Sequence, residues 1–211
     1  MRTHLSSRGS LALLALALLS GPAVAHHPMG GQTPQTFLHG LLSGLGHPVI
    51  GPDHLAFIVA IGIAAALVPA GVGLIGAFVA ASTAGVLVHL GAVSVPAAEA
   101  LVAGSVIAAG ALVASGGRPG SGVWLGLAAL AGLLHGYVFG EAIVGADRAV
   151  VGAYLVGLAI VASAIAFALM TVTQTMIERA VLKPVVLRTA GVMLGCVGVV
   201  MLAGSLVVFP A

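Results

Sequence analysis

Hydrophobic residues form six long stretches in this chain, and most charged residues lie in the short segments between them. Each stretch is bounded by proline, glycine or a charged residue, and each is long enough to cross a membrane as a helix. The stretches are 37–68, 71–91, 96–115, 121–140, 149–175 and 186–209. The pattern predicts an all-α polytopic membrane protein with about six transmembrane helices in one domain, residues 37–211.

The N-terminus has the pattern of a cleavable signal peptide. Arg2 and Arg8 precede a short apolar run, and Ala23-Val24-Ala25 is a small-x-small cleavage site. We expect residues 1–25 to be removed, which leaves a His-containing segment, residues 26–36, outside the cytoplasm. The alternative is an uncleaved first helix, although the apolar run is short for a span.

Charge between the stretches predicts the orientation. With the mature N-terminus outside, the turns after the third and fifth stretches face the cytoplasm, and they carry Arg118, Arg179, Lys183 and Arg188. The outer connections are mainly acidic, apart from Arg148. This positive-inside distribution supports an even number of spans after cleavage.

Composition agrees with a membrane protein and excludes other classes. The chain is 60% hydrophobic and 6% charged, with a mean hydropathy of +1.23. A soluble domain has about 25% charged residues, so this chain cannot cover a water-facing surface. Seven Lys+Arg against five Asp+Glu provide too little positive charge for nucleic-acid binding. Cys196 is the one cysteine, which excludes an intrachain disulfide.

The first stretch is too long for one straight helix. Its 32 residues, 37–68, would reach about 48 Å at 1.5 Å per residue. A bilayer core is only about 30 Å thick. Pro48 and Pro52 both disfavour helical geometry at the residue before them. We therefore expect an unwound turn over residues 47–54, of the kind that lines binding sites in transporters.

Polar side chains cluster at this predicted break. His47, Asp53 and His54 interrupt an otherwise apolar run. An aspartate at the centre of a span costs about 2.5–3.5 kcal/mol on insertion scales, which favours a functional role over a capping role. On a continuous helix the two imidazoles would be about 10 Å apart along the axis, too far for one ion. An unwound turn would let both imidazoles and the carboxylate approach one metal ion.

Further candidates lie in other stretches. His135 and Glu141 are six residues apart in the fourth stretch, and we interpret them as site residues rather than a structural histidine and a boundary glutamate. Glu99 opens the third stretch, where pairing with the helix dipole would also explain it. His39 and His89 are expected at the membrane interface, with no ligand role.

Imidazole and carboxylate donors favour a borderline divalent ion such as Ni²⁺, Co²⁺ or Zn²⁺. The chain has eight histidines, one cysteine and six scattered methionines, which disfavours a Cu(I) site. After cleavage, His26 would offer its amine and imidazole to an external ion, with His27 beside it. These residues are candidates for a collecting end, although their proximity could equally be incidental.

Short repeats point to related halves of the chain. LHGLLSG from Leu38 recurs in form as LHGYVFG from Leu134, in the first and fourth stretches. Such a repeat would make two inverted three-span halves. The glycines of the fourth stretch also form small-xxx-small repeats, which permit close helix packing.

Three motifs together resemble the HupE/UreJ family of nickel and cobalt permeases: HPVIGPDH at 47–54, PAAEALVAGSV at 96–106 and HGYVFGEAIVGA at 135–146. The resemblance implies a multi-pass protein of the bacterial cytoplasmic membrane that admits Ni²⁺ or Co²⁺ and is not an enzyme. Some members have a second histidine in the third motif, where this chain has Phe139. The resemblance implies functional positions at His47, Asp53, His54, His135, Glu141, Glu99 and Ser105.

Two other classes of function remain open from the residues. A membrane-embedded metal-dependent hydrolase would also place His and Asp in spans, but it usually has a denser motif such as HExxH, which is absent. A haem-b protein would use intramembrane histidines as axial ligands. For a permease we expect a metal ion as the substrate, no permanent cofactor and a surrounding lipid bilayer. The sequence leaves the oligomeric state open, and a homo-oligomer is one alternative.

Overall fold

A computed structural model of the chain describes residues 32–116 and 119–208. These residues form α-helices and one short 3₁₀ helix, with no strand among them, so the predicted all-α class is confirmed. The elements are α2 (Phe37–Ile50), α3 (Pro52–Leu67), α4 (Gly71–Leu90), α5 (Ala98–Ala114), α6 (Ser121–Gly140), η2 (Glu141–Ile143), α7 (Arg148–Glu178) and α8 (Pro184–Val208). The predicted signal peptide and His26 and His27 lie outside the described residues.

The predicted membrane character is confirmed, with one difference in length. Within the described residues, α4, α7, α8 and the continuous unit α6–η2 are long and apolar enough to cross a membrane, and α2 with α3 makes one bent span. The third predicted stretch, 96–115, is the apolar helix α5, which at 17 residues is shorter than these spans. α5 begins only after Ala97, because the left-handed backbone conformation of Ala97, with φ of 55°, cannot be part of a right-handed α-helix.

The predicted break in the first span is confirmed, and it is tighter than expected. α2 and α3 meet at an angle of 79°. The non-helical residue is Gly51 alone, with φ −79° and ψ 110°. The expectation of an unwound turn over residues 47–54 is therefore wrong in extent, because Pro48 is accommodated inside α2. Pro52 prevents Gly51 from being helical and then serves as the first residue of α3, where its missing N–H costs no helical hydrogen bond.

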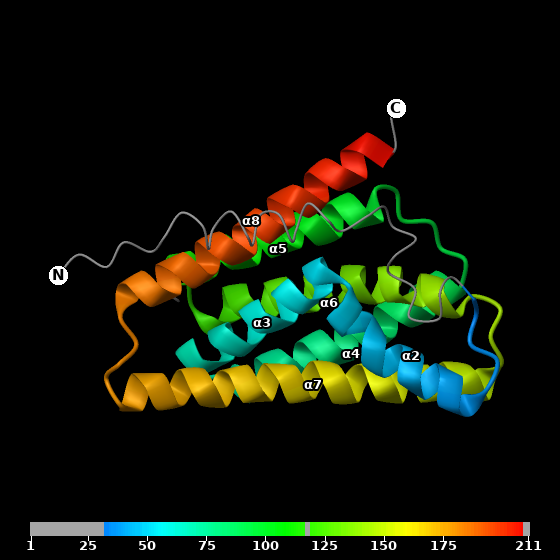
Figure 1. The fold of residues 1–211 in the computed structure, drawn as a ribbon, viewed down its shortest axis with the longest axis horizontal. Helices are drawn as coiled ribbons and strands as arrows, with labels where there is room; N and C mark the ends of the chain where they lie inside the picture. The colour runs from blue at the N-terminus through cyan, green and yellow to red at the C-terminus, as the bar shows by residue number, and fades with distance from the viewer. Residues whose placement is uncertain (1–31, 117–118, 209–211) are drawn as a thin grey trace.

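Close glycine contacts hold the helices in pairs, α2 on α7, α4 on α6, and α5 on α8 (Figure 1). A Cβ atom at Gly44 would lie 2.1 Å from the carbonyl oxygen of Tyr154, and one at Gly136 would lie 2.0 Å from that of Ser82. Any larger residue at these positions would push the backbones apart. The small-residue packing predicted for the fourth stretch is thus present, and the first stretch has it as well.

The pairing supports the predicted repeat. If the halves α2–α5 and α6–α8 are equivalent, α4 corresponds to α7, and the pair α4–α6 corresponds to α7–α2. The glycines of the two repeat segments make equivalent contacts: Gly40 and Gly44 pack on α7, whereas Gly136 and Gly140 pack on α4. α5 pairs with its own counterpart, α8, as a pseudo-two-fold relation requires.

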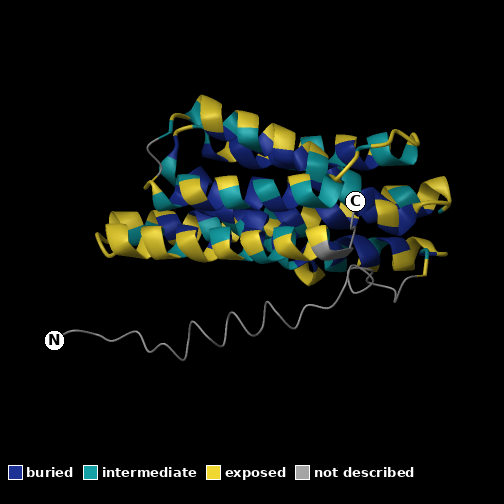
Figure 2. Cartoon of the chain, turned by 90° about the horizontal axis from the view of Figure 1, so that it is seen from above, coloured by how far each residue is buried: buried dark blue, intermediate teal, exposed yellow. Residues whose placement is uncertain are grey.

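The buried core lies between the helices, and large apolar side chains cover the outer surface. Figure 2 shows the buried residues on the inner faces of the helices and the exposed ones on the outer faces. Exposed leucines and valines, such as Leu130 at 61% and Val199 at 55%, would be unfavourable in water over so large an area. They are compatible with lipid tails, so this surface agrees with membrane insertion.

Candidate metal-binding site

Three imidazoles from three helices meet in the interior. His47 is in the last turn of α2, His54 in the first turn of α3 and His135 in α6, and all three are at most 2% exposed. The ring centroids of His47 and His54 are 5.8 Å apart, and those of His54 and His135 are 4.9 Å apart. We call these three residues the imidazole cluster. The break at Gly51 creates it, since a continuous helix would separate His47 from His54.

Asp53 adds a carboxylate beside the cluster. It is 8% exposed, and its Oδ1 accepts a hydrogen bond of 2.9 Å from the backbone N–H of His54. The same oxygen lies 4.0 Å from Nε2 of His54. Because Asp53 lies in the first turn of α3, its carboxylate is near the positive end of the helix dipole.

Tyr154 of α7 holds His47 and was not identified from the sequence. Its hydroxyl group lies 2.7 Å from Nδ1 of His47 and donates a hydrogen bond of 2.9 Å to the carbonyl of Phe139. Tyr154 has no exposed surface. The one signal in the sequence was a phenol, a side chain with a polar end, within the long apolar stretch 149–175.

Ser105 of α5 holds His135 on the other side of the cluster. Its Oγ lies 3.0 Å from Nε2 of His135 and donates a hydrogen bond of 2.7 Å to the carbonyl of Val102. Nδ1 of His135 lies 2.8 Å from Nδ1 of His54. Ser105, which the family resemblance indicated, is thereby connected to His54 through His135.

Aromatic side chains enclose the cluster. The ring of Phe139 packs on His54 at 4.3 Å and on His47 at 5.0 Å, and Phe57 packs on His135 at 4.7 Å. Phe139 therefore packs against two of the three imidazoles of the cluster. Phe139 and Phe57 thus cover imidazoles that are at most 2% exposed.

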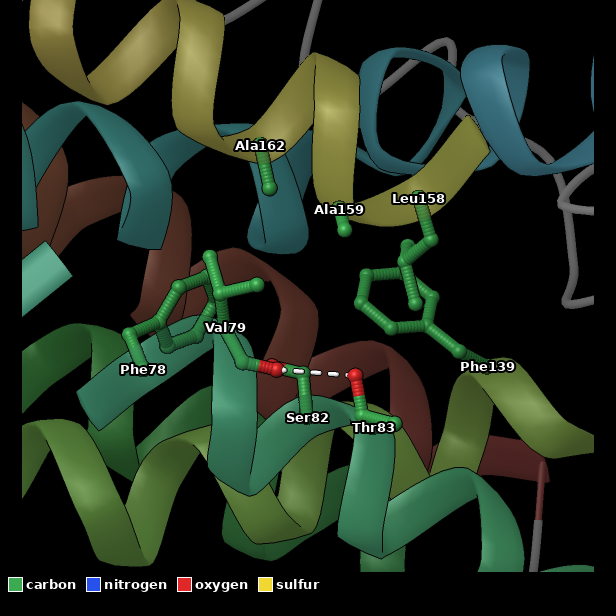
Figure 3. Close-up of a pocket in the computed structure, with 8 residues that line it drawn as sticks. All are labelled: Phe78, Val79, Ser82, Thr83, Phe139, Leu158, Ala159 and Ala162. Atoms are coloured by element: carbon green, nitrogen blue, oxygen red, sulfur yellow. Dashed lines mark hydrogen bonds between the residues drawn. The ribbon is translucent and has the colours of Figure 1, made fainter. Parts of the chain in front are cut away.

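Phe139 also lines a narrow crevice between α4, α6 and α7 (Figure 3). Ser82 and Thr83 lie on its α4 side, and Leu158 and Ala162 lie on its α7 side. The Thr83 hydroxyl is bonded to its own helix, through the carbonyl of Val79 at 3.1 Å. The crevice has no room for a water molecule, so this conformation is closed beside the cluster.

The remaining predicted residues lie at other places in the fold. Glu141 is exposed in η2, and Glu99 is partly buried in the first turn of α5. His89 is partly buried, and its ring packs on Tyr137 at 4.6 Å. His39 is exposed near the start of α2. The roles of Glu99 and Glu141 as charge partners stay predictions.

The arrangement brings ligand types together without yet forming a tight chelate. Among the described residues, no three His, Cys, Asp or Glu side chains are close enough to hold one ion. Bonds of about 2.0–2.2 Å place neighbouring ligands of one ion roughly 3.0–3.4 Å apart. The 4.0 Å between Asp53 Oδ1 and His54 Nε2 exceeds this range by a fraction of an ångström. A small side-chain movement would therefore bring these two donors to one ion.

Comparison with known proteins assigns the chain to a family. Neither a curated protein sequence nor a solved structure matches it. The family described as HupE / UreJ protein matches residues 14–201, a range that includes the whole imidazole cluster and the residues that contact it. Because this match extends over most of the 211 residues, the chain belongs to the HupE/UreJ family, a transporter-type membrane protein family associated with nickel and cobalt.

Proposed function

We propose that this protein admits Ni²⁺ or Co²⁺ across the bacterial cytoplasmic membrane, by secondary transport or facilitated uptake, and that His47, Asp53 and His54 bind the ion on its way. Family membership supports a transporter rather than an enzyme. The chemistry of the donors supports the kind of ion, because imidazole nitrogen with carboxylate oxygen suits borderline divalent metals.

The observation that carries the proposal is the break at Gly51, which joins a buried carboxylate to two buried imidazoles inside a membrane span. Burying an aspartate in a span costs about 2.5–3.5 kcal/mol on insertion scales, so such a residue is usually retained for function. A divalent cation between these donors would compensate the negative charge. The aspartate and the metal would thus stabilise one another in an apolar environment.

We infer the following order of events. A hydrated ion reaches the site from the periplasmic side, where the mature N-terminus with His26 and His27 would help to collect it. It exchanges water for the side chains of Asp53, His54 and His47. Glu99 or Glu141, both nearer the outer ends of their helices by the predicted topology, would compensate charge along the way.

Release to the cytoplasm requires the cluster to open. Phe139 separates the cluster from the crevice between α4, α6 and α7, and that crevice is closed in this conformation. Because α4–α6 and α2–α7 touch through glycines, their backbones present few side-chain obstacles to sliding. Rocking of these pairs with a turn of the Phe139 ring would open the inner side.

One geometric observation disfavours the haem alternative. The imidazoles of His54 and His135 are hydrogen-bonded directly, with 2.8 Å between their Nδ1 atoms. Two axial haem ligands would instead have the iron between their nitrogens, about 4 Å apart for two bonds of the usual metal–imidazole length. Metal-dependent hydrolysis is disfavoured by the sequence instead, which lacks a motif such as HExxH.

The test is uptake of radiolabelled Ni²⁺ and Co²⁺ by cells that express the wild type, Asp53→Asn or His54→Ala. Asp53→Asn keeps an oxygen that accepts the His54 N–H bond but removes the charge. Matched controls are Asp147→Asn and His39→Ala, because both residues are exposed and lie outside the cluster. Membrane abundance of every variant is measured by immunoblot and equalised.

We expect both site variants to lose at least about 90% of the uptake, because removal of even an outer-shell partner of a metal ligand commonly costs about 10- to 100-fold, while the controls keep wild-type rates. Uptake by Asp53→Asn at the wild-type rate and at equal abundance would show that the site is misassigned. Wild-type cells that accumulate neither metal above vector controls would refute the proposed function itself.

A further inference from the structure

We propose that Tyr154 and Ser105 are positioning residues that hold His47 and His54 in the same tautomer, with the proton on Nδ1 and the lone pair on Nε2. The ligand role of these lone pairs rests on the proposed function, whereas the tautomers themselves follow from the hydrogen bonds. Two separate chains of hydrogen bonds, which we call relays, lead to this result. The first runs from α6 through α7 to His47, and the second runs from α5 through α6 to His54.

The first relay fixes His47. A phenol has one hydrogen, and Tyr154 donates it to the carbonyl of Phe139 over 2.9 Å. The phenol oxygen can therefore only accept from Nδ1 of His47, which lies 2.7 Å away. A carbonyl cannot donate, so the direction of the whole relay is set by the backbone. His47 must then carry its proton on Nδ1, which leaves the lone pair of the neutral ring on Nε2.

The second relay fixes His54 through an additional imidazole. Ser105 donates its one hydrogen to the carbonyl of Val102 over 2.7 Å, so its oxygen accepts from Nε2 of His135, 3.0 Å away. With its proton on Nε2, neutral His135 has its lone pair on Nδ1. This atom lies 2.8 Å from Nδ1 of His54 and must accept from it. His54 therefore carries a proton on Nδ1, and in the neutral ring its lone pair is on Nε2, the nitrogen 4.0 Å from the Asp53 carboxylate.

Both relays thus give the arrangement that metal sites use. A histidine that ligates a metal through one nitrogen usually donates its other N–H to a carbonyl, carboxylate or similar group, and this bond fixes the ring and raises its basicity. Here the acceptors are Tyr154 for His47 and His135 for His54. His135, predicted from the sequence as a ligand, acts in this assignment as the link between Ser105 and His54.

The tautomers can be measured directly in the metal-free protein. Side-chain nitrogen resonances of ¹⁵N-histidine-labelled protein in detergent, near pH 8, distinguish a protonated ring nitrogen from one with a lone pair. Single His→Gln variants assign the signals. We expect Nδ1–H for His47 and His54 and Nε2–H for His135. A neutral Nε2–H tautomer or a doubly protonated ring at either His47 or His54 overturns the proposal, and this measurement in the wild type needs no variant to fold.

Variants then test the consequence for metal binding. Tyr154→Phe removes the acceptor of His47 and keeps the ring, and its control is Tyr137→Phe, which loses a hydroxyl that accepts from the backbone N–H of Val95. Ser105→Ala removes the acceptor of His135. Its control is Ser115→Ala at the C-terminal cap of the same helix, where the serine Oγ also donates to the carbonyl three residues before it, that of Leu112. Ser105→Thr keeps the hydroxyl and should restore the wild-type behaviour.

We expect Ni²⁺ affinity, measured by calorimetry on purified protein, to fall about 10- to 100-fold in Tyr154→Phe and Ser105→Ala, the usual effect of removing such a partner. The controls and Ser105→Thr should stay within about twofold of the wild type. Unchanged affinity in both relay variants overturns the positioning role. A wild type that binds neither Ni²⁺ nor Co²⁺ refutes the proposed function instead, and the resonances of the metal-free protein still decide the tautomers.

Discussion

Gly44→Ala tests whether the packing of α2 on α7 positions the site. Gly44 lies one turn before His47, and a Cβ atom there would be 2.1 Å from the carbonyl oxygen of Tyr154 and 2.9 Å from the amide nitrogen of Leu158. Real Cβ atoms essentially never approach such atoms within 3.0 Å. The two backbones must therefore separate by at least about 0.9 Å, the difference between 3.0 and 2.1 Å, because neither is a flexible side chain.

This displacement has a structural and a functional consequence. Overpacking costs about 1–3 kcal/mol, against which alanine regains up to about 1 kcal/mol of helix propensity over glycine. If α2 moves as a rigid body away from α7, the 2.7 Å bond between His47 and Tyr154 lengthens to about 3.6 Å, beyond a hydrogen bond. We expect the melting temperature to fall by about 2–8 °C and Ni²⁺ uptake to fall at least about tenfold.

The assay combines thermal unfolding of the detergent-solubilised protein with radiolabelled Ni²⁺ uptake at equal membrane abundance. The control is Gly152→Ala on α7, where a Cβ atom would have no neighbour within 4 Å. This variant should be as active as the wild type and as stable or slightly more stable. If Gly44→Ala behaves like Gly152→Ala in both measurements, the close contact of α2 with α7 does not position His47.

Two other predictions concern the aromatic wall and the N-terminus. Phe139→His places a third nitrogen donor beside His47 and His54, whose rings are now 5.0 and 4.3 Å from the phenyl ring, and should tighten Ni²⁺ binding several-fold while slowing uptake. Calorimetry measures the Ni²⁺ affinity and radiolabelled uptake measures the rate, and the control is Phe37→His on the exposed face of α2. Equal effects of the two variants would contradict the prediction. Mass spectrometry of the purified membrane protein should find a mature chain that begins at His26, and an intact Met1 would instead mean that the first apolar segment is retained.

Local sequence was enough to predict the spans and the break. The Gly51-Pro52 pair acts on its own backbone, because a residue before proline is disfavoured in the helical region whatever surrounds it. The predicted break is too long because the same local rule, applied to Pro48, extends it to residue 47. Pro48 carries the same local signal, but in the last turn of α2 the loss of one hydrogen bond is tolerated and the helix continues to Ile50.

The partners of the cluster could not be predicted in the same way. Tyr154 is 107 positions from His47 in the sequence, and His135 is 81 positions from His54. Which face of α7 meets α2 depends on where glycines allow the backbones to touch, and this contact is a property of both helices together. Glu141 was grouped with His135 by spacing, but six residues on, past the end of α6, it is exposed.

The sequence alone therefore determined that this is a membrane protein of helices, that its first span is broken, and that His47, Asp53 and His54 lie at the break. These features depend on hydropathy and on backbone preferences that act over a few residues. The tertiary structure alone decided which side chains face one another, that Tyr154 and Ser105 anchor the imidazoles, and that Phe139 encloses them. The direction of a side chain across a helix pair depends on the rotation and depth of packing, and the chain specifies these through contacts between residues that are distant in sequence.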